Sequence, residues 1–342
     1  MLGSGAVPDA VESWEVPHLI SVVIPVYGGE LTLAGVVDEV LALATEQRTP
    51  DGYPYRVTEV VLVYDNGRDD SARVMRELAD SHELVRLVWL SRNYGQHAAT
   101  LAGMASSGGE WIVTLDEDGQ HDPADIAALL DTAMREQSAV VYAKPTNKPS
   151  HGFLRNSASR GAKWVLTKFF AGSNAQDYQS FRLVLGSIGR GVAAYAGSGV
   201  YLDVALGWVA PPATTAPVTL RDEGDRRSGY SARRLFSHFW RMVITSGTRG
   251  LRFVSLLGAA FAVVGVGVSI YLLVSRLTGV EAPEGWASTI VVVLLSAGAI
   301  LVAIGIVAEY VGVSVNMSLG RPPYLVTGDP AAGPLGRRRP LS

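Results

Sequence analysis

The sequence predicts an α/β fold: a mostly parallel, doubly wound sheet with helices on both faces, followed by a hairpin of two membrane-spanning helices. Two observations predict it. Short apolar, β-branched runs alternate five times with segments of helical spacing in the N-terminal half, a pattern typical of parallel α/β sheets. Two long uncharged apolar runs then follow near the C-terminus. The length of 342 residues is enough for two or three structural units.

The expected strands are apolar runs bounded by Pro, Gly or polar residues. They are 19–26, 58–64, 84–90, 111–115 and 139–143. The expected helices carry apolar residues every three to four positions. They are 31–44, 71–81, 96–106 and 123–136, the last with Pro123 in its first turn. Residues 1–17 precede the first strand and are expected to form a flexible lead.

Both C-terminal apolar runs, Phe253–Val274 and Ser288–Ala308, lack charged residues. At ~1.5 Å per residue, each is long enough to cross a hydrocarbon core of ~30 Å. Buried core helices are the alternative, but runs that are apolar on every face are rare in soluble folds. Two transmembrane helices are therefore predicted within 251–313.

Arginines flank this pair of helices on one side. They precede the first run at 233, 234, 241, 249 and 252 and follow the second at 321 and 337–339, whereas the connector 275–287 has one arginine and two glutamates. Positively charged flanks stay in the cytoplasm, and no signal-peptide pattern opens the chain. The N-terminal region and the tail 314–342 are therefore predicted on the cytoplasmic side of the cell (plasma) inner membrane, in a multi-pass protein.

Two further segments are predicted to lie at the membrane surface. Segment 153–170 combines apolar and cationic side chains in a basic amphipathic pattern, which suits a bilayer with anionic headgroups. The alternative is that its basic face packs on the domain's own core. Segment 231–250 is predicted as a juxtamembrane helix, with Leu235–Ile244 as its amphipathic part.

Composition excludes several kinds of protein. The net charge of −3 gives no support for a nucleic-acid binder, so no nucleic-acid partner is expected. The absence of cysteine excludes a disulfide framework and a cysteine-ligated zinc site.

The strongest chemical signal is the acidic run that follows the strand 111–115. Asp116 and Asp118 alternate at the end of this strand, and Gln120 adds a neutral oxygen. Oxygen ligands at a strand end can hold a hard divalent cation, which in turn binds a phosphate. The alternative is a polar turn that caps the next helix, and we favour that role for Asp122 before Pro123. The sequence thus predicts an enzyme with a phosphorylated or nucleotide-linked substrate.

Other polar residues follow neighbouring strands. Asp65 ends the strand 58–64 and is equally consistent with contact to a base or sugar and with turn chemistry. Gly95 opens a helix whose N-terminus favours an anion. His97 is expected to be a packed or solvent-facing histidine rather than a general base. Arg226 lies in a cluster that is consistent with phosphate binding, with a juxtamembrane positive charge, or with both.

Several of these segments together resemble one family. The chain is similar to glycosyltransferase family 2, GT-A-fold, polyprenyl-phosphate glycosyltransferases over about 19–326. It resembles bacterial undecaprenyl-phosphate sugar transferases, such as the 4-deoxy-4-formamido-L-arabinose transferases and the glucosyltransferases, and more distantly the dolichol-phosphate mannose synthases. The segments that carry the resemblance are SVVIPVY, LSRNYGQHAATLAGMASSGGEWIVTLDEDGQHDP, DYQSFRL, RRSGYS and AEYVG…RPPYLV.

The resemblance implies a cytoplasmic catalytic domain over 18–230 and assigns roles to its residues. The nucleotide-sugar site would comprise Pro25, Tyr27, Glu30, Asp65, Asn93, Gly95, Gln96 and Asp116. Mg²⁺ or Mn²⁺ would be held by Asp116, Asp118 and Gln120. The acceptor or its phosphate would lie near Asp177, Ser180, Arg182, Arg226 and Ser231. The catalytic residues would be Asp116, Asp118 and Arg226.

The implied activity is inverting transfer of a sugar from a nucleotide-sugar donor, expected to be UDP-linked, to a polyprenyl (undecaprenyl or decaprenyl) phosphate at the cytoplasmic face of the bilayer. The product would be a lipid-linked monosaccharide for cell-envelope glycan modification. The resemblance also implies a homo-oligomer, of which a tetramer is one form. A processive polysaccharide synthase-like enzyme and a catalytically altered membrane scaffold with the same fold are the alternatives.

The chain departs from the family pattern at two nucleotide-site motifs. The glycines Gly28 and Gly29 come before the acid Glu30, where the family usually has Asn-Glu directly after the tyrosine. Tyr64 replaces the first of two acids that usually precede Gly-Ser. The acids predicted to hold the cation are intact, so activity is still expected.

Overall fold

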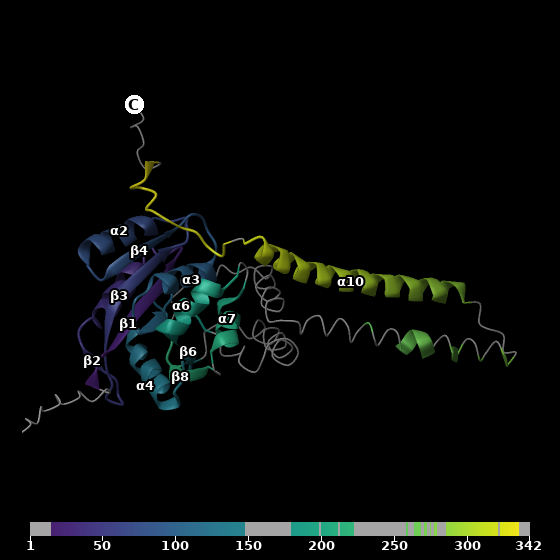
Figure 1. The fold of residues 1–342 in the computed structure, drawn as a ribbon, viewed down its shortest axis with the longest axis horizontal. Helices are drawn as coiled ribbons and strands as arrows, with labels where there is room; N and C mark the ends of the chain where they lie inside the picture. Colours follow the sequence, from purple (N-terminus) through teal and green to yellow (C-terminus); the bar gives the residue numbers. More distant parts are fainter. Residues whose placement is uncertain are drawn as a thin grey trace, which may run out of the picture. The chain divides into compact units, whose positions relative to one another are not determined.

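The computed structural model describes residues 15–147, 179–197, 200–210, 213–221, 285–320 and 322–334, with scattered positions between 258 and 278 (Figure 1). The chain divides into two compact units. One comprises 1–159, 174–229 and 322–342, and the other 160–173 and 230–321. The predicted surface helices 153–170 and 231–250 lie outside the described residues, as does most of the predicted span Phe253–Val274.

The first unit contains a mixed sheet, which has nine strands among the described residues, in the order β8-β6-β7-β5-β1-β3-β4-β9 with β2 paired to β3. The strands are β1 His18–Val26, β2 Gln47–Arg48, β3 Pro54–Tyr64, β4 Val85–Leu90, β5 Trp111–Thr114, β6 Val140–Pro145, β7 Arg182–Leu185, β8 Thr214–Val218 and β9 Val326–Thr327. All five predicted strands are confirmed. The sheet is less parallel than predicted, because the antiparallel β7 lies between β5 and β6.

Helices cover both faces of the sheet, as predicted. They are α1 Leu33–Leu41, α2 Ser71–Ser81, α3 Gln96–Ser106, the short 3-10 helix η2 Pro123–Asp125, α4 Ile126–Glu136, α6 Gly186–Tyr195 and α7 Leu202–Val209. One hydrophobic cluster joins the sheet to α1, α2 and α4. A second joins the opposite face to α3, α6 and α7. Alternate side chains of β1 enter the two clusters, since Val22 and Ile24 lie in the first and Val23 in the second.

Helix α3 packs unusually close to the sheet because of a glycine. A Cβ atom at Gly103 would lie 2.3 Å from Cγ1 of Val23 and 2.9 Å from Cγ2 of Val63. Either distance is far below an ordinary van der Waals contact. The absence of a side chain at Gly103 therefore lets α3 lie directly on Val23 of β1 and Val63 of β3.

The strand order creates a topological switch point between β1 and β5. From β1 the chain adds β3 and β4 on one side, and it then crosses back to place β5 on the other side of β1. In open α/β sheets, ligands bind outside the carboxyl ends of the strands at such a point. Tyr27 follows β1 and Asp116 follows β5, so the acidic run lies at this position.

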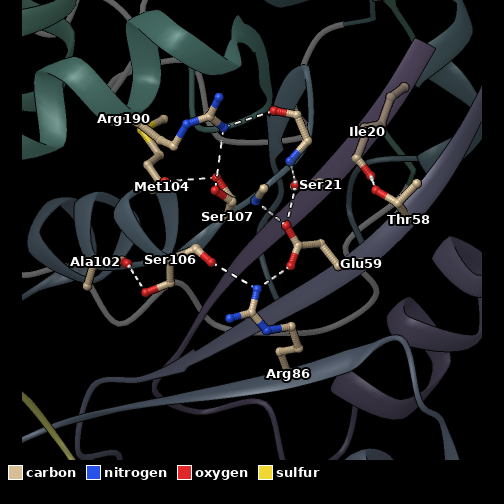
Figure 2. A network of polar contacts seen from close by, with 12 residues as sticks. Ile20, Ser21, Thr58, Glu59, Arg86, Ala102, Met104, Ser106, Ser107 and Arg190 are labelled. Carbon is tan, nitrogen blue, oxygen red and sulfur yellow. Dashed lines mark hydrogen bonds and ion pairs between the residues drawn. The ribbon is translucent and has the colours of Figure 1, made fainter.

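A polar network fixes the turn that leads into β5, toward the amino ends of the strands (Figure 2). The carboxylate of Glu59 accepts hydrogen bonds from Ser21 Oγ at 2.6 Å, from the Gly108 amide at 2.5 Å and from Arg86 Nη1 at 2.5 Å. Ser21 Oγ in turn accepts from the Gly109 amide at 2.7 Å. Burial alone would raise the pKa of Glu59, but these donors hold it below its usual value. The network anchors β5 and so contributes to the position of its carboxyl end.

The second unit contains the helix α10, Trp286–Ser318. It includes the predicted span Ser288–Ala308 and extends ten residues beyond it. Its most apolar 18-residue window, Leu295–Gly312, has a mean hydropathy of 1.9, and side chains such as Leu295 and Leu301 are exposed. Within the part of the chain that the structure describes, this is the one helix with the length and composition to cross a membrane.

Candidate active site

The site is built at the carboxyl ends of β1, β3 and β5. Hydrogen bonds between neighbouring strands align these ends: the Asp65 amide donates to Val26 O at 2.8 Å, and the Leu115 amide donates to Val23 O at 3.0 Å. Three loops therefore leave the sheet side by side. They carry the predicted residues Tyr27, Asp65 and Asp116.

Asp116 is held by side chains from two other elements. Its Oδ1 accepts a hydrogen bond from Gln96 Nε2 at the start of α3, at 2.6 Å, and its Oδ2 accepts from Ser180 Oγ, at 2.5 Å. Burial and the nearby Asp118 carboxylate raise the pKa of Asp116 to about 6, while Ser180 and Arg182 oppose that rise. The structure thus brings two predicted residues, Gln96 and Ser180, to the carboxylate of a third, Asp116.

Asp118 and Gln120 lie in the turn that follows. The Gln120 amide donates to Asp118 Oδ1 at 3.1 Å, and Gly119 adopts a positive φ of 75° that suits glycine. Arg221 fixes the chain from Gln120 to Asp122. Its amide donates to Gln120 O at 2.9 Å, and its guanidinium forms ion pairs with Asp122 and with Glu39, each at 2.8 Å. Asp122 also accepts from the Ala124 amide at 2.9 Å, which confirms its predicted capping role.

The arrangement fits a divalent cation in its chemistry. Asp116 and Asp118 are close enough that the charge of one raises the pKa of the other, and a cation between them would relieve this repulsion. The described residues hold no group of three or more His, Cys, Asp or Glu side chains arranged as a metal site. A cation here would therefore depend on two carboxylates, a neutral oxygen such as that of Gln120, and oxygens of the substrate.

Glu117, between the two aspartates, has a different task. Its Oε2 accepts from the Tyr27 amide at 2.9 Å and its Oε1 accepts from the Gly28 amide at 2.8 Å. Burial raises its pKa to about 7 although both amides oppose that rise. A Cβ atom at Gly29 would lie 2.7 Å from Glu117 Oε2. Glycine at position 29 thus has a local reason, because it leaves room for the Glu117 carboxylate.

Asp65 is buried, with 3% of its surface exposed, and lies beneath the start of α3. Its carboxylate accepts from the amides of Tyr94 at 2.7 Å and Gly95 at 2.8 Å, and its carbonyl oxygen accepts from Asn93 Nδ2 at 3.0 Å. Burial raises the pKa of Asp65, and the two amides partly oppose this. Gly95 has a φ of 94°, a conformation that favours glycine. Hydrogen bonds therefore connect Asp65, which follows β3, to Asn93 and Gly95 in the loop that follows β4.

Glu30 links the loops after β1 and β3. Its amide donates to Asp69 Oδ2 at 3.0 Å, and its Oε2 accepts from the Asp70 amide at 3.2 Å. Beside it, the Gly29 amide donates to Ser71 Oγ at 2.9 Å. Pro25 is the partly buried penultimate residue of β1, and the Tyr27 side chain that follows is 41% exposed. Tyr27 is thus open to a ligand, while its backbone is fixed by Glu117.

The match to known proteins extends over nearly the whole chain. The model of glycosyl transferase family 2 matches residues 21–190. A relative from Pseudomonas aeruginosa named undecaprenyl-phosphate 4-deoxy-4-formamido-L-arabinose transferase is 30% identical over 312 residues, which cover 90% of this chain and 89% of the relative. Proteins of the same name from Yersinia pestis and Edwardsiella ictaluri are 30% and 29% identical and are covered to 92% and 93%.

The chain belongs to glycosyl transferase family 2. It is therefore an enzyme of the glycosyltransferase class, as the sequence resemblance predicted. Among solved structures, the Mycobacterium tuberculosis glucosyl-3-phosphoglycerate synthase in complex with Mn²⁺, UDP and phosphoglyceric acid is 16% identical with a TM-score of 0.46, covering 68% of this chain and 78% of that one. S. aureus TarS in complex with UDP-GlcNAc is 13% identical with a TM-score of 0.44, covering 71% and 72%.

In this family 2 enzyme, Arg182 lies beneath the site. It is 3% exposed and forms an ion pair with Asp203 of α7, which is also 3% exposed and accepts from Tyr142 OH at 2.9 Å. Its Nε also donates to Ser180 O at 3.4 Å. The guanidinium predicted to lie near the acceptor thus supports the strand that presents Ser180 to Asp116. Sequence reasoning missed Asp203, which lies within an apolar helix, and it missed the role of Glu117.

The remaining predicted residues, Asp177, Arg226 and Ser231, lie outside the described residues. His97, which follows Gln96 on α3, has its ring 3.8 Å from that of Tyr201 between centroids. This placement agrees with a packed histidine. The described residues therefore include every predicted nucleotide-sugar and metal residue, together with Ser180 and Arg182 of the predicted acceptor group.

Proposed function

We propose that this family 2 enzyme is a membrane-bound inverting glycosyltransferase that moves a sugar from a nucleotide-sugar donor, UDP-linked, to a polyprenyl phosphate of the undecaprenyl or decaprenyl type. The product is a lipid-linked monosaccharide that serves the modification of cell-envelope glycans. The observation that carries the proposal is the pair Asp116 and Asp118 at the switch point between β1 and β5, in a chain that matches polyprenyl-phosphate sugar transferases over about 90% of its length.

The donor side follows from the three loops. Tyr27 stands at the end of β1, where a base or ribose would lie, and Asp65 at the end of the neighbouring β3 fixes the loop 91–95 beside it. Asp116, Asp118 and Gln120 would hold Mg²⁺ or Mn²⁺, which when bound stabilises the negative charge that develops on the leaving nucleoside diphosphate. Gln96 and Ser180 orient Asp116 through the two hydrogen bonds described above. The chain itself thus supplies the fixed carboxylate of Asp116 and, with Asp118, two neighbouring negative charges that favour the binding of a cation.

The acceptor needs little activation. A phosphate monoester has a second pKa of ~6, so it is largely dianionic at neutral pH and can attack an anomeric carbon without a strong base. The protein's main tasks are to align two anions and to exclude water. We assign phosphate contact to Arg226, which follows Arg221 by five positions in the sequence. A single displacement inverts the anomeric centre, so an α-linked donor gives a β-linked product.

The membrane arrangement supports a lipid acceptor. The apolar helix α10 and the uncharged run Phe253–Val274 together would form the transmembrane hairpin, with 153–170 and 231–250 at the bilayer surface. The arginine-rich flanks support a position of the catalytic domain, 18–230, on the cytoplasmic side of the inner membrane. We also propose a homo-oligomer, with a tetramer as one form.

The test is an assay of lipid product. Purified full-length protein in detergent or nanodiscs is incubated with Mn²⁺ or Mg²⁺, undecaprenyl or decaprenyl phosphate, and a panel of labelled nucleotide sugars. One donor should yield an organic-soluble product, and NMR of that product should show the inverted anomer. The Asp118→Asn variant should insert and fold but form no product.

Two results would contradict the proposal. No lipid-linked sugar with any donor, while a known undecaprenyl-phosphate sugar transferase is active in the same assay, would favour the altered scaffold. A polymer of several sugars in place of a single transferred residue would favour a processive synthase.

A further inference from the structure

The segment that follows α10 returns to the catalytic sheet. Residues 322–334, here named the return segment, run along the edge of the sheet beside β4 and α2 (Figure 1). In β9, Val326 pairs with Leu90 and Thr327 with Trp89, antiparallel to β4. Leu325 O also accepts the Ser91 amide at 3.0 Å. The return segment therefore satisfies backbone groups of β4 that an edge strand would expose.

Side chains strengthen this attachment. Arg76 of α2 donates through Nε and Nη2 to the two carboxylate oxygens of Asp329, at 2.7 and 2.8 Å. The Arg76 guanidinium also lies 4.9 Å from the ring centre of Trp89 in β4. Asp329 is 22% and Arg76 34% exposed, so the pair is partly shielded from solvent. Such a bidentate pair defines the position of the return segment better than a single contact would.

The return segment contacts the same loop that holds Asp65. The loop 91–95 begins at Ser91, which is bonded to Leu325, and ends at the Tyr94 and Gly95 amides, which bind the Asp65 carboxylate. Ser91 Oγ lies 3.0 Å from Tyr94 OH, within hydrogen-bond distance. Tyr324 and Tyr94 pack against the same hydrophobic cluster. A continuous set of contacts therefore connects the return segment to Asp65.

We propose that the return segment positions the loop 91–95, and through it Asp65, for binding of the nucleotide donor. Arg76 and Asp329 are positioning residues for this step, since neither touches the acidic run at the site. The inference rests on the proposed function for the identity of the ligand, a uridine nucleotide. In the sequence, Pro322 follows the last residue of α10, Ser318, by four positions, so few residues separate this helix from the return segment.

The test compares two arginines of the same helix in the full-length protein. Arg76→Gln breaks the pair with Asp329, whereas the control Arg73→Gln breaks exposed pairs with Asp70 and Glu77 within α2 itself. Hydrogen exchange of the peptide that spans 91–95 is measured without ligand, and affinity for UDP with Mn²⁺ is measured by calorimetry. Arg76→Gln should raise the exchange and weaken UDP binding by roughly fivefold. Arg73→Gln should change neither.

The donor KM of Arg76→Gln should rise while kcat at saturating donor stays within twofold, because the reacting groups are untouched. The charge-swapped double variant Arg76→Asp with Asp329→Arg should restore part of the affinity, and it serves as the fold control if the single variant is unstable. Unchanged exchange of 91–95 in a folded Arg76→Gln protein would overturn the proposal. Absence of UDP binding in the unmodified protein would instead overturn the proposed function, and the exchange data would still decide the positioning role.

Discussion

Removal of the Asp203 carboxylate should strongly destabilise the catalytic domain. Asp203 and Arg182 are each 3% exposed, and they pair beneath the strand that presents Ser180. In Asp203→Ala, the Arg182 guanidinium would stay buried without its counter-charge, and Tyr142 OH would lose its acceptor. The perturbation therefore measures the cost of an uncompensated buried charge together with the loss of one buried hydrogen-bond acceptor.

The magnitude follows from the burial of the pair. Removing one partner of a buried ion pair costs about 3–5 kcal/mol. For a domain of about 200 residues, each kcal/mol corresponds to ~2–4 °C in melting temperature, so the expected fall is roughly 6–20 °C. The double replacement Arg182→Met with Asp203→Leu should recover most of this loss, because it removes both buried charges and so leaves no charge without a partner.

The assay is thermal unfolding of the detergent-solubilised protein, followed by intrinsic fluorescence. The matched control is Arg135→Gln, which breaks an exposed pair with Asp51 at 3.4 Å and should shift the melting temperature by no more than ~2–4 °C. A melting temperature of Asp203→Ala close to that of the unmodified protein, together with a large rise in the KM for the acceptor, would refute this reasoning. That result would mean that Arg182 acts on the acceptor.

Three further predictions follow from other parts of the fold. The pKa of Glu59 is lowered in the folded protein from its usual value of 4.5. Its stabilisation is therefore complete above that value and is lost as the pH falls through the lower folded value. Glu59→Gln should cost about 1–3 kcal/mol at pH 7 and progressively less only below the usual value, by thermal unfolding at each pH. The pKa of Asp116 is raised to about 6. The affinity for Mn²⁺, measured by calorimetry, should therefore be constant above that pH and fall about tenfold for each pH unit below it. An affinity that does not change with pH would exclude Asp116 as a ligand. Gly103→Ala should destabilise the protein by ~1–3 kcal/mol, because the added Cβ would overlap β1. The control Gly191→Ala adds its Cβ in open space on α6 and should stabilise the protein by ~0.5–1 kcal/mol. Equal melting temperatures of these two variants would contradict the close packing of α3.

The core strands could be predicted because their signal is local. Segments such as 58–64 are apolar and β-branched without interruption, which reflects burial on both faces. The strands that sequence reasoning missed obtain their structure from distant partners. β9 has two residues, Val326 and Thr327, and carries no periodicity; it forms because β4 offers an unpaired edge. The sequence Arg182–Leu185 of β7 similarly gains its place by antiparallel pairing with β5 and β6.

The location of the candidate site was predictable, but the division of tasks among its acids was not. The position of Asp116 and Asp118 after a buried strand predicts a site there, and the strand order puts them at the switch point. The role of Glu117 depends on backbone amides 89 and 90 positions away in the sequence. No local pattern distinguishes a carboxylate that binds a cation from a neighbour that fixes a loop. The tertiary fold decides it.

The central claim is that Asp116 and Asp118 hold a divalent cation that binds the donor diphosphate. The most direct measurement is calorimetric titration of UDP, with and without Mn²⁺, into the full-length unmodified protein and into the full-length Asp118→Asn variant. The two proteins should have the same melting temperature, so that a difference in binding does not reflect unfolding. The account predicts that Mn²⁺ strengthens UDP binding to the unmodified protein at least tenfold and leaves binding to Asp118→Asn unchanged. An equal effect of Mn²⁺ on both proteins would contradict it.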